Sequence, residues 1–258
     1  MIPPFARVIG VDFSASHAAG RGIWLAVGLA DRLVLEYLTP ACELPGGGVD
    51  RAAALERGAL IGFDFPFGLP ASFAWPRNWR RFVIEFPERH PDPERFRADC
   101  RTRARGREVK RRTDREARTP FCAYNLRLYR QTWWGLTGVL APLLGADAVA
   151  APPMTALADD RPAVVETCPA STLKRLGLYR SYKGRFPAAV AARAAILSRL
   201  TAAGLEPKPT FVELAVGHSG GDALDAMIAA FASWQVARDP SHFVPRDWID
   251  RLEARILV

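Results

Sequence analysis

Five acidic residues occupy positions from which a carboxylate could do chemistry. Asp12, Asp64 and Glu166 each end a short apolar run, and Asp222 and Asp225 stand three residues apart ahead of an alanine-rich stretch. Carboxylates held close together repel one another unless a divalent cation neutralises them, and Mg²⁺ and Mn²⁺ prefer oxygen ligands. Two such ions about 3.5–4 Å apart activate the attacking water and stabilise the leaving oxygen in phosphodiester cleavage. The pattern therefore indicates a catalytic set of all five, with Asp12, Asp64 and Asp225 as ligands of Mg²⁺ or Mn²⁺.

Each acid also has a structural interpretation. Asp12 could accept hydrogen bonds from the backbone amides of the next turn, and Asp64 could form a turn before Phe-Pro-Phe-Gly. Asp222 follows a serine at the spacing of a capping box, and Glu166 is open to either interpretation. An acid without a partner costs free energy at the end of a buried strand or on the apolar face of a helix. This cost favours a functional role for Asp12 and Asp225.

An alternation of strand-like and helix-like segments must position these acids. Runs rich in apolar and β-branched residues predict five strands, at residues 7–13, 22–29, 33–38, 59–64 and 162–166. Helical patterns occur at residues 49–57, 127–144, 187–203 and 219–234. A hairpin-length link makes the first three strands antiparallel, and crossover helices then place the fourth and fifth parallel to the first. If the first, fourth and fifth strands are neighbours, Asp12, Asp64 and Glu166 project near the same carboxyl edge of a mixed α/β sheet, where ligands of open α/β sheets bind.

Most of the positive charge falls in one segment. Residues 95–118 hold eleven Lys or Arg against four Asp or Glu, a net charge of +7, while the whole chain carries +8. Such a block attracts a polyanion by releasing its counterions, and nucleic acid is the commonest polyanion in a cytoplasm. Arg111 and Arg112 in this segment, and Lys183 in a later loop, are the candidate substrate-binding residues. The alternative is a solvated, arginine-rich helix without a ligand.

Length and composition bound the class of protein. The 258 residues, 49% hydrophobic and 24% charged, fit a single domain over residues 1–258, with a basic Arg, Pro and aromatic-rich insertion at residues 71–125 after the fourth strand. No run approaches the roughly 20 apolar residues that span a bilayer, and the N-terminus lacks the pattern of a signal peptide. Four scattered cysteines form neither a metal nor a disulfide pattern. We therefore expect a cytoplasmic protein without a membrane partner.

Four stretches together resemble the DUF429 family, which are predicted nucleases of ribonuclease-H-like fold: Gly10-Val-Asp12-Phe-Ser, Ile61-Gly-Phe-Asp64-Phe-Pro-Phe-Gly-Leu-Pro70, Val165-Glu166-Thr-Cys-Pro169 and Asp222-Ala-Leu-Asp225-Ala. On this resemblance Asp12 matches the metal ligand of the first strand and Asp64 the acid of the fourth. Asp222 and Asp225 match the C-terminal pair, and Glu166 matches the Glu-x-x-Pro strand end. The paired aspartates are also similar to those of RuvC-type Holliday-junction resolvases. The resemblance implies a ribonuclease-H-like sheet and metal-dependent hydrolysis of nucleic acid.

Two other function classes stay open. Actin-like and hexokinase-like phosphotransferases share this core, and Asp12-Phe-Ser14 is similar to their first phosphate loop. Those enzymes usually combine two copies of the core with ATP between them, whereas this sequence shows one copy and no second Asp-x-Gly hairpin. The other class is a nucleic-acid-binding module whose acids no longer form a working site. Such a module would bind in a salt-sensitive manner without metal-dependent turnover.

Overall fold

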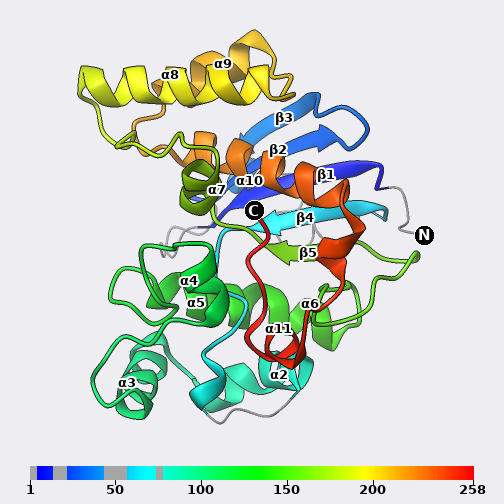
Figure 1. Cartoon of the computed structure of the whole chain (residues 1–258), viewed down its shortest axis with the longest axis vertical. Coiled ribbons are helices and arrows are strands. Elements are labelled where there is room, and N and C mark those ends of the chain that lie inside the picture. The colour runs from blue at the N-terminus through cyan, green and yellow to red at the C-terminus, as the bar shows by residue number, and fades with distance from the viewer. Residues whose placement is uncertain (1–4, 14–21, 44–56, 74–77) are drawn as a thin grey trace.

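The computed structural model describes residues 5–13, 22–43, 57–73 and 78–258 (Figure 1). Within these ranges five strands form one sheet in the order β3-β2-β1-β4-β5. The strands are β1 (Arg7–Asp12), β2 (Trp24–Leu29), β3 (Leu35–Pro40), β4 (Ala59–Phe63) and β5 (Ala163–Glu166). β2 pairs antiparallel with both β1 and β3, whereas β4 runs parallel to β1 and β5 parallel to β4. The predicted mixed α/β sheet, with three antiparallel strands followed by parallel ones, is confirmed.

The strands β1, β4 and β5 are buried along nearly their whole length. Continuous apolar runs of this kind are typical of strands that helices cover on both faces. Alternate side chains of β1 pack into two separate hydrophobic cores, because successive side chains of a strand point to opposite faces of the sheet. Ile9 and Val11 pack into one core, and Val8 packs into the other.

Helices cover both faces of the sheet (Figure 1). On one face lie α7 (Pro169–Arg175), α8 (Pro187–Ala202), α9 (Pro209–Gly217) and α10 (Asp222–Ala237). On the other lie α2 (Trp79–Arg89), α3 (Pro93–Arg103), α4 (Arg112–Glu116), α5 (Tyr129–Gly135), the π-helical η3 (Leu136–Leu140), α6 (Ala141–Gly145) and α11 (Trp248–Glu253). Among the described residues, no helix combines the length and apolar character needed to cross a bilayer.

Three of the predicted helices are present. α8 and α10 stand where two of them were predicted, and the third, at residues 127–144, folds as α5, η3 and α6. Most of the helix predicted at residues 49–57 lies outside the described ranges. The segment 71–125, interpreted above as an insertion, forms α2, α3 and α4 and places Phe86 and Phe96 in the core beside the sheet. This segment therefore builds part of the hydrophobic core as well as carrying positive charge.

β1 passes directly against α10 at Gly10. A Cβ added there would lie 2.1 Å from the Ala230 amide nitrogen and 2.2 Å from the Ala226 carbonyl oxygen, which are backbone atoms that cannot rotate away. We expect Gly10→Ala to lower the free energy of unfolding by about 3 kcal/mol or more, at the upper end of ordinary overpacking costs. Gly145→Ala is the matched control, because a Cβ there meets no atom within 4 Å. Urea denaturation that finds both variants equally stable would contradict this close approach.

Candidate acidic active site

Three acidic side chains meet where β1 ends and α10 begins. Asp12 is the last residue of β1, and Asp222 and Asp225 lie in the first turn of α10. One carboxylate oxygen of each lies within 4.8 Å of those of the other two. The close packing of Gly10 against α10 brings the strand end to the helix start, and residues three apart on a helix share a face. The structure thus brings together three of the five acids selected from the sequence.

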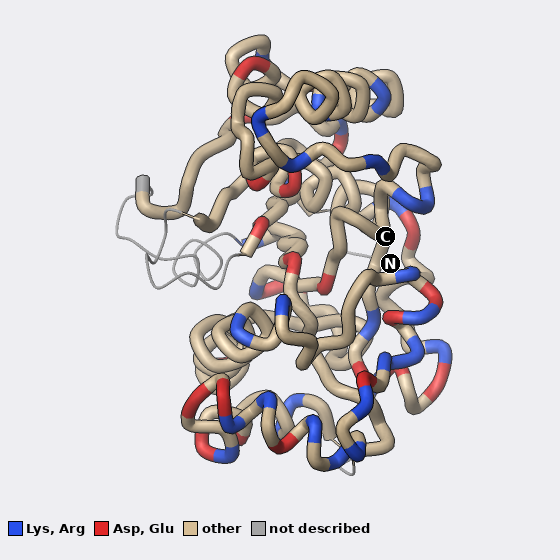
Figure 2. Tube along the Cα trace, turned by 90° about the vertical axis from the view of Figure 1, so that its left-hand side faces the viewer, with Lys and Arg blue, Asp and Glu red and all other residues tan. Residues whose placement is uncertain are grey.

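Asp64 and Glu166 stand at the ends of the neighbouring parallel strands β4 and β5, outside this group of three. Asp64 lines the same pocket as Asp225, and the Asp225 charge acts on its carboxyl group. Figure 2 shows several acidic positions in the middle of the molecule and many basic positions in its lower half. The three acids predicted at one edge of the sheet, Asp12, Asp64 and Glu166, thus stand at the ends of neighbouring strands, although they do not form one cluster.

Two neighbouring side chains hold the carboxylate of Asp225. The ammonium Nζ of Lys183 lies 2.7 Å from Oδ2 of Asp225 and 3.9 Å from Oδ1 of Asp222. The hydroxyl of Tyr182 donates a hydrogen bond of 2.6 Å to Oδ1 of Asp225. The sequence predicts Lys183 as a substrate contact, and in the structure its ammonium is a counter-ion of the acidic group. Sequence reasoning missed Tyr182, which stands next to Lys183 in the chain.

Burial and mutual repulsion raise the pKa values of these acids. The pKa of Asp12 lies well above its ordinary value, because burial disfavours the charged form and the carboxylates of Asp225 and Asp64 repel it. Burial also raises the pKa of Asp225, and Lys183 offsets this only in part. Burial, followed by the charge of Asp225, raises the pKa of Asp64 to about 8. The site therefore contains more carboxyl groups than can ionise together near neutral pH without a further cation.

Asp64→Asn should stabilise the metal-free protein, relative to the parent, increasingly as the pH rises. The folded protein keeps a proton on Asp64 up to about pH 8, whereas the unfolded chain releases it near the ordinary pKa of 3.8. The parent therefore loses stability between about pH 4 and 8, and Asn abolishes this loss. Urea unfolding in EDTA should show the stability gap between variant and parent widening by about 1 kcal/mol or more from pH 5 to pH 8. A gap that stays constant or narrows would contradict the raised pKa.

The carboxylate of Glu166 forms an ion pair with a buried arginine. The side chain of Arg111 is inaccessible to solvent, and its Nη1 donates to Oε2 of Glu166 at 2.8 Å. Its Nη2 donates to Oδ1 of Asp114 at 2.8 Å, and the Phe67 amide donates to Oε2 of Glu166 at 2.9 Å. This differs from the predicted roles of Arg111 as a substrate contact and Glu166 as a catalytic acid, since both side chains already have protein partners. Their geometry is that of a structural ion pair beneath the site.

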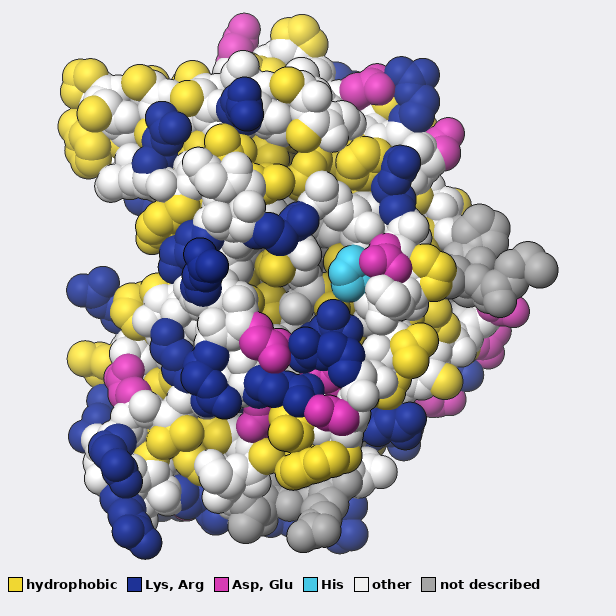
Figure 3. All heavy atoms as spheres, viewed as in Figure 1, with side chains coloured by type: hydrophobic (Ala, Val, Ile, Leu, Met, Phe, Trp, Pro, Cys, Tyr) yellow, Lys and Arg dark blue, Asp and Glu magenta, His cyan; other side chains and the backbone are white. Residues whose placement is uncertain are grey.

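Arg112 is likewise engaged within the protein. Its guanidinium donates to Asp247 at 2.9 Å and to Asp250 at 2.5 Å, which ties α4 to α11. Figure 3 shows basic and acidic side chains interleaved over this part of the surface. To bind a substrate as predicted, the guanidinium of Arg112 would have to give up its ion pairs with Asp247 and Asp250. In the basic segment, the arginines that form no ion pair with a described acid are Arg97, Arg101, Arg105, Arg107, Arg115 and Arg118.

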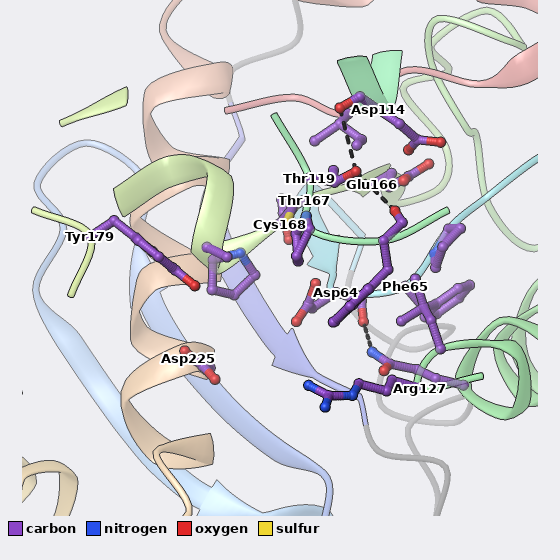
Figure 4. A pocket seen from close by; sticks show the side chains of 18 of the residues that line it. Asp64, Phe65, Asp114, Thr119, Arg127, Glu166, Thr167, Cys168, Tyr179 and Asp225 are labelled. Atoms are coloured by element: carbon purple, nitrogen blue, oxygen red, sulfur yellow. Dashed lines mark hydrogen bonds between the residues drawn. The ribbon is translucent and has the colours of Figure 1, made fainter. Parts of the chain in front are cut away.

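A pocket of about 370 Å³ opens beside the acids. Asp64 and Asp225 line it together with Lys183, and further cations and aromatic rings contribute to its walls. In the close-up view Tyr179 reaches toward the acids from one side and Arg127 from another (Figure 4). The pocket therefore combines buried acids with positively charged groups, an arrangement that suits a phosphate-containing ligand bound through a cation.

Comparisons with known proteins place the chain in one family. The family model described as "Protein of unknown function (DUF429)" matches residues 10–248, which include all five of the acids. No curated protein and no solved structure matches the chain. The match confirms the resemblance that the four sequence stretches indicate. The chain belongs to the DUF429 family of proteins of unknown function.

Proposed function

We propose that this protein is a divalent-metal-dependent nuclease of ribonuclease-H-like fold that hydrolyses phosphodiester bonds of nucleic acid in the cytoplasm. The observation that carries the proposal is the convergence of Asp12, Asp222 and Asp225 within 4.8 Å at the end of the central strand. Asp64 lines the adjoining pocket, whose walls also include basic side chains. The described residues contain one five-stranded sheet. This favours a nuclease over a phosphotransferase, which would need two copies of the core.

The donor set fits a hard divalent cation. Three carboxylates lie close together, and their oxygen atoms are the ligands that Mg²⁺ and Mn²⁺ prefer. The pKa values of Asp12 and Asp225 are raised because the nearby positive charge of Lys183 does not compensate for burial and mutual repulsion. A bound cation would supply the missing positive charge. We propose that Asp12, Asp222 and Asp225 hold the ion and that Asp64 assists from the pocket side. Asp222 thus takes the place that sequence reasoning gave to Asp64 in the primary ligand set.

The bound cation would supply Lewis acidity to the phosphodiester and lower the pKa of the attacking water. The protein's own groups contribute the remaining chemistry. A cation held by the neighbouring acids would favour the ionised form of Asp64, and that carboxylate could then accept a proton from a water molecule in the pocket. If Asp225 were to hold a cation, the ammonium of Lys183 would be free to contact a phosphate oxygen of the substrate.

The test is a cleavage assay on the full chain. Labelled DNA and RNA, each as single strand and as duplex, are incubated with Mg²⁺, with Mn²⁺ and with EDTA. We expect cleavage of at least one form in the presence of either metal and none in EDTA. Equal cleavage in EDTA would contradict the metal mechanism. Absence of cleavage of every form would contradict the nuclease proposal and leave a binding module as the better interpretation.

A further inference from the structure

The walls of the pocket carry groups that the acidic site itself does not use. Phe121 and Tyr179 contribute aromatic rings, and Arg127 and Arg180 contribute guanidinium groups. Tyr179 is 51% exposed, which is a large exposure for an aromatic side chain beside a pocket. These four residues come from two separate stretches of the chain, before α5 and after α7, which meet across the pocket.

Each aromatic ring has a cation beside it. The Lys174 ammonium lies 4.8 Å from the ring centroid of Tyr179, and the Arg127 guanidinium lies 5.6 Å from that of Phe121. Arg127 and Arg180 are exposed and form no ion pair with any acid in the described ranges. A ring offers a stacking surface to any nucleobase, and a neighbouring cation offers a contact to a phosphate. The pocket walls thus match the two parts of a nucleotide.

The size and depth of the pocket discriminate between substrates. A volume of about 370 Å³ lies at the small end of the range for pockets that enclose a small ligand, so it accommodates about one nucleotide. Asp225 lines the pocket and is only 2% exposed, so a reacting phosphate must descend between the walls to approach it. A base-paired nucleotide is stacked within a rigid duplex and cannot enter alone, whereas an unpaired nucleotide can.

We propose that the substrate of this site is a single-stranded polynucleotide, with one unpaired base stacked on Tyr179 or Phe121 and its phosphate held by Arg127 and Arg180. This inference rests on the proposed nuclease function and names its substrate class. Tyr179 and Arg180 act in it as binding residues, and the acids perform the hydrolysis. The stacking is tolerant of sequence, because every base has an aromatic face.

Binding without turnover tests the inference. A 20-nucleotide fluorescent strand, as DNA and as RNA, is titrated with the full chain in Ca²⁺, alone and annealed to its complement, and anisotropy is measured. We expect the single strand to bind at least about tenfold more tightly than the duplex. Tyr179→Ala should weaken single-strand binding by about tenfold, the loss expected for one stacked base, and Tyr179→Phe should restore it. Tyr37→Ala, which changes a 60% exposed tyrosine on β3, is the matched control and should bind like the parent.

The outcomes separate this inference from the nuclease proposal. Equal or tighter binding of the duplex, or an unchanged affinity in Tyr179→Ala, would overturn the single-strand inference even if the protein cleaves nucleic acid. Selective, Tyr179-dependent binding of the single strand without cleavage in Mg²⁺ or Mn²⁺ would support the inference and overturn the nuclease proposal. Failure to bind any strand would overturn both.

Discussion

Asp12→Asn is expected to abolish metal-dependent cleavage while the protein remains folded. The substitution keeps the shape of the side chain and removes one of the three carboxylates of the acidic group. Loss of the transition-state stabilisation that a bound metal supplies, several kcal/mol, corresponds to a rate loss on the order of a thousandfold. Because burial and like charges already raise the pKa of Asp12, its neutral replacement should leave the metal-free protein as stable as the parent or more stable.

Cleavage rates in Mn²⁺ and melting temperatures in EDTA measure the two parts of this prediction. Asp225→Asn and Asp222→Asn should lose cleavage as Asp12→Asn does, since all three belong to the same group. Asp31→Asn is the matched control, because it changes an exposed aspartate in the turn between β2 and β3 and should cleave at the parent rate. A folded Asp12→Asn variant that cuts as fast as the parent would exclude Asp12 from the mechanism.

Arg111→Ala is expected to destabilise the protein by about 3–5 kcal/mol, the usual cost of leaving a buried charge without its partner. Arg111 is inaccessible to solvent and donates to both Asp114 and Glu166, so its loss leaves two buried carboxylates uncompensated. Removing an exposed arginine of the same segment, as in Arg118→Ala, should change stability by less than about 0.5 kcal/mol. Urea unfolding of both variants provides the comparison.

A compensating substitution keeps this prediction testable if Arg111→Ala fails to fold. In Arg111→Met with Glu166→Gln, one of the two buried carboxylates is replaced by a neutral group of similar shape, so part of the stability should return. If Arg111→Ala unfolds at the same urea concentration as the parent, the ion pair beneath the sheet edge contributes nothing and the structural role assigned to Glu166 is wrong.

The edge of the sheet at which the acids lie could be predicted from the sequence. Short apolar runs that end in an acid, and the hairpin-length link after the second strand, are local signals. They predict the strand directions and, with the first, fourth and fifth strands as neighbours, Asp12, Asp64 and Glu166 at one edge. Which of the acids come within a few ångströms of one another depends on how closely β1 packs on α10 at Gly10. No local sequence pattern specifies that packing distance.

Non-local partners account for the other differences. Glu166 is engaged by Arg111, which lies 55 residues away in the chain, so its sequence neighbourhood gives no sign of the ion pair. The capping interpretation of Asp222 is wrong, because the N-cap of α10 is Gly221, which adopts a left-handed conformation at φ +85°. The helices α2 and α3 were not predicted, because the charge and proline content of their segment obscures a helical pattern. Asn78 and Asp92, which cap them, are the signals that could have indicated where they begin.

Diffraction from crystals soaked in Mn²⁺ tests the central claim most directly. Mn²⁺ scatters anomalously, so its position can be found without assuming which residues bind it. The account predicts a peak about 2.2 Å from carboxylate oxygens of Asp12, Asp222 and Asp225, with the Lys183 ammonium displaced from Asp225. A crystal that shows no peak at this group, with Lys183 still paired to Asp225, would contradict it.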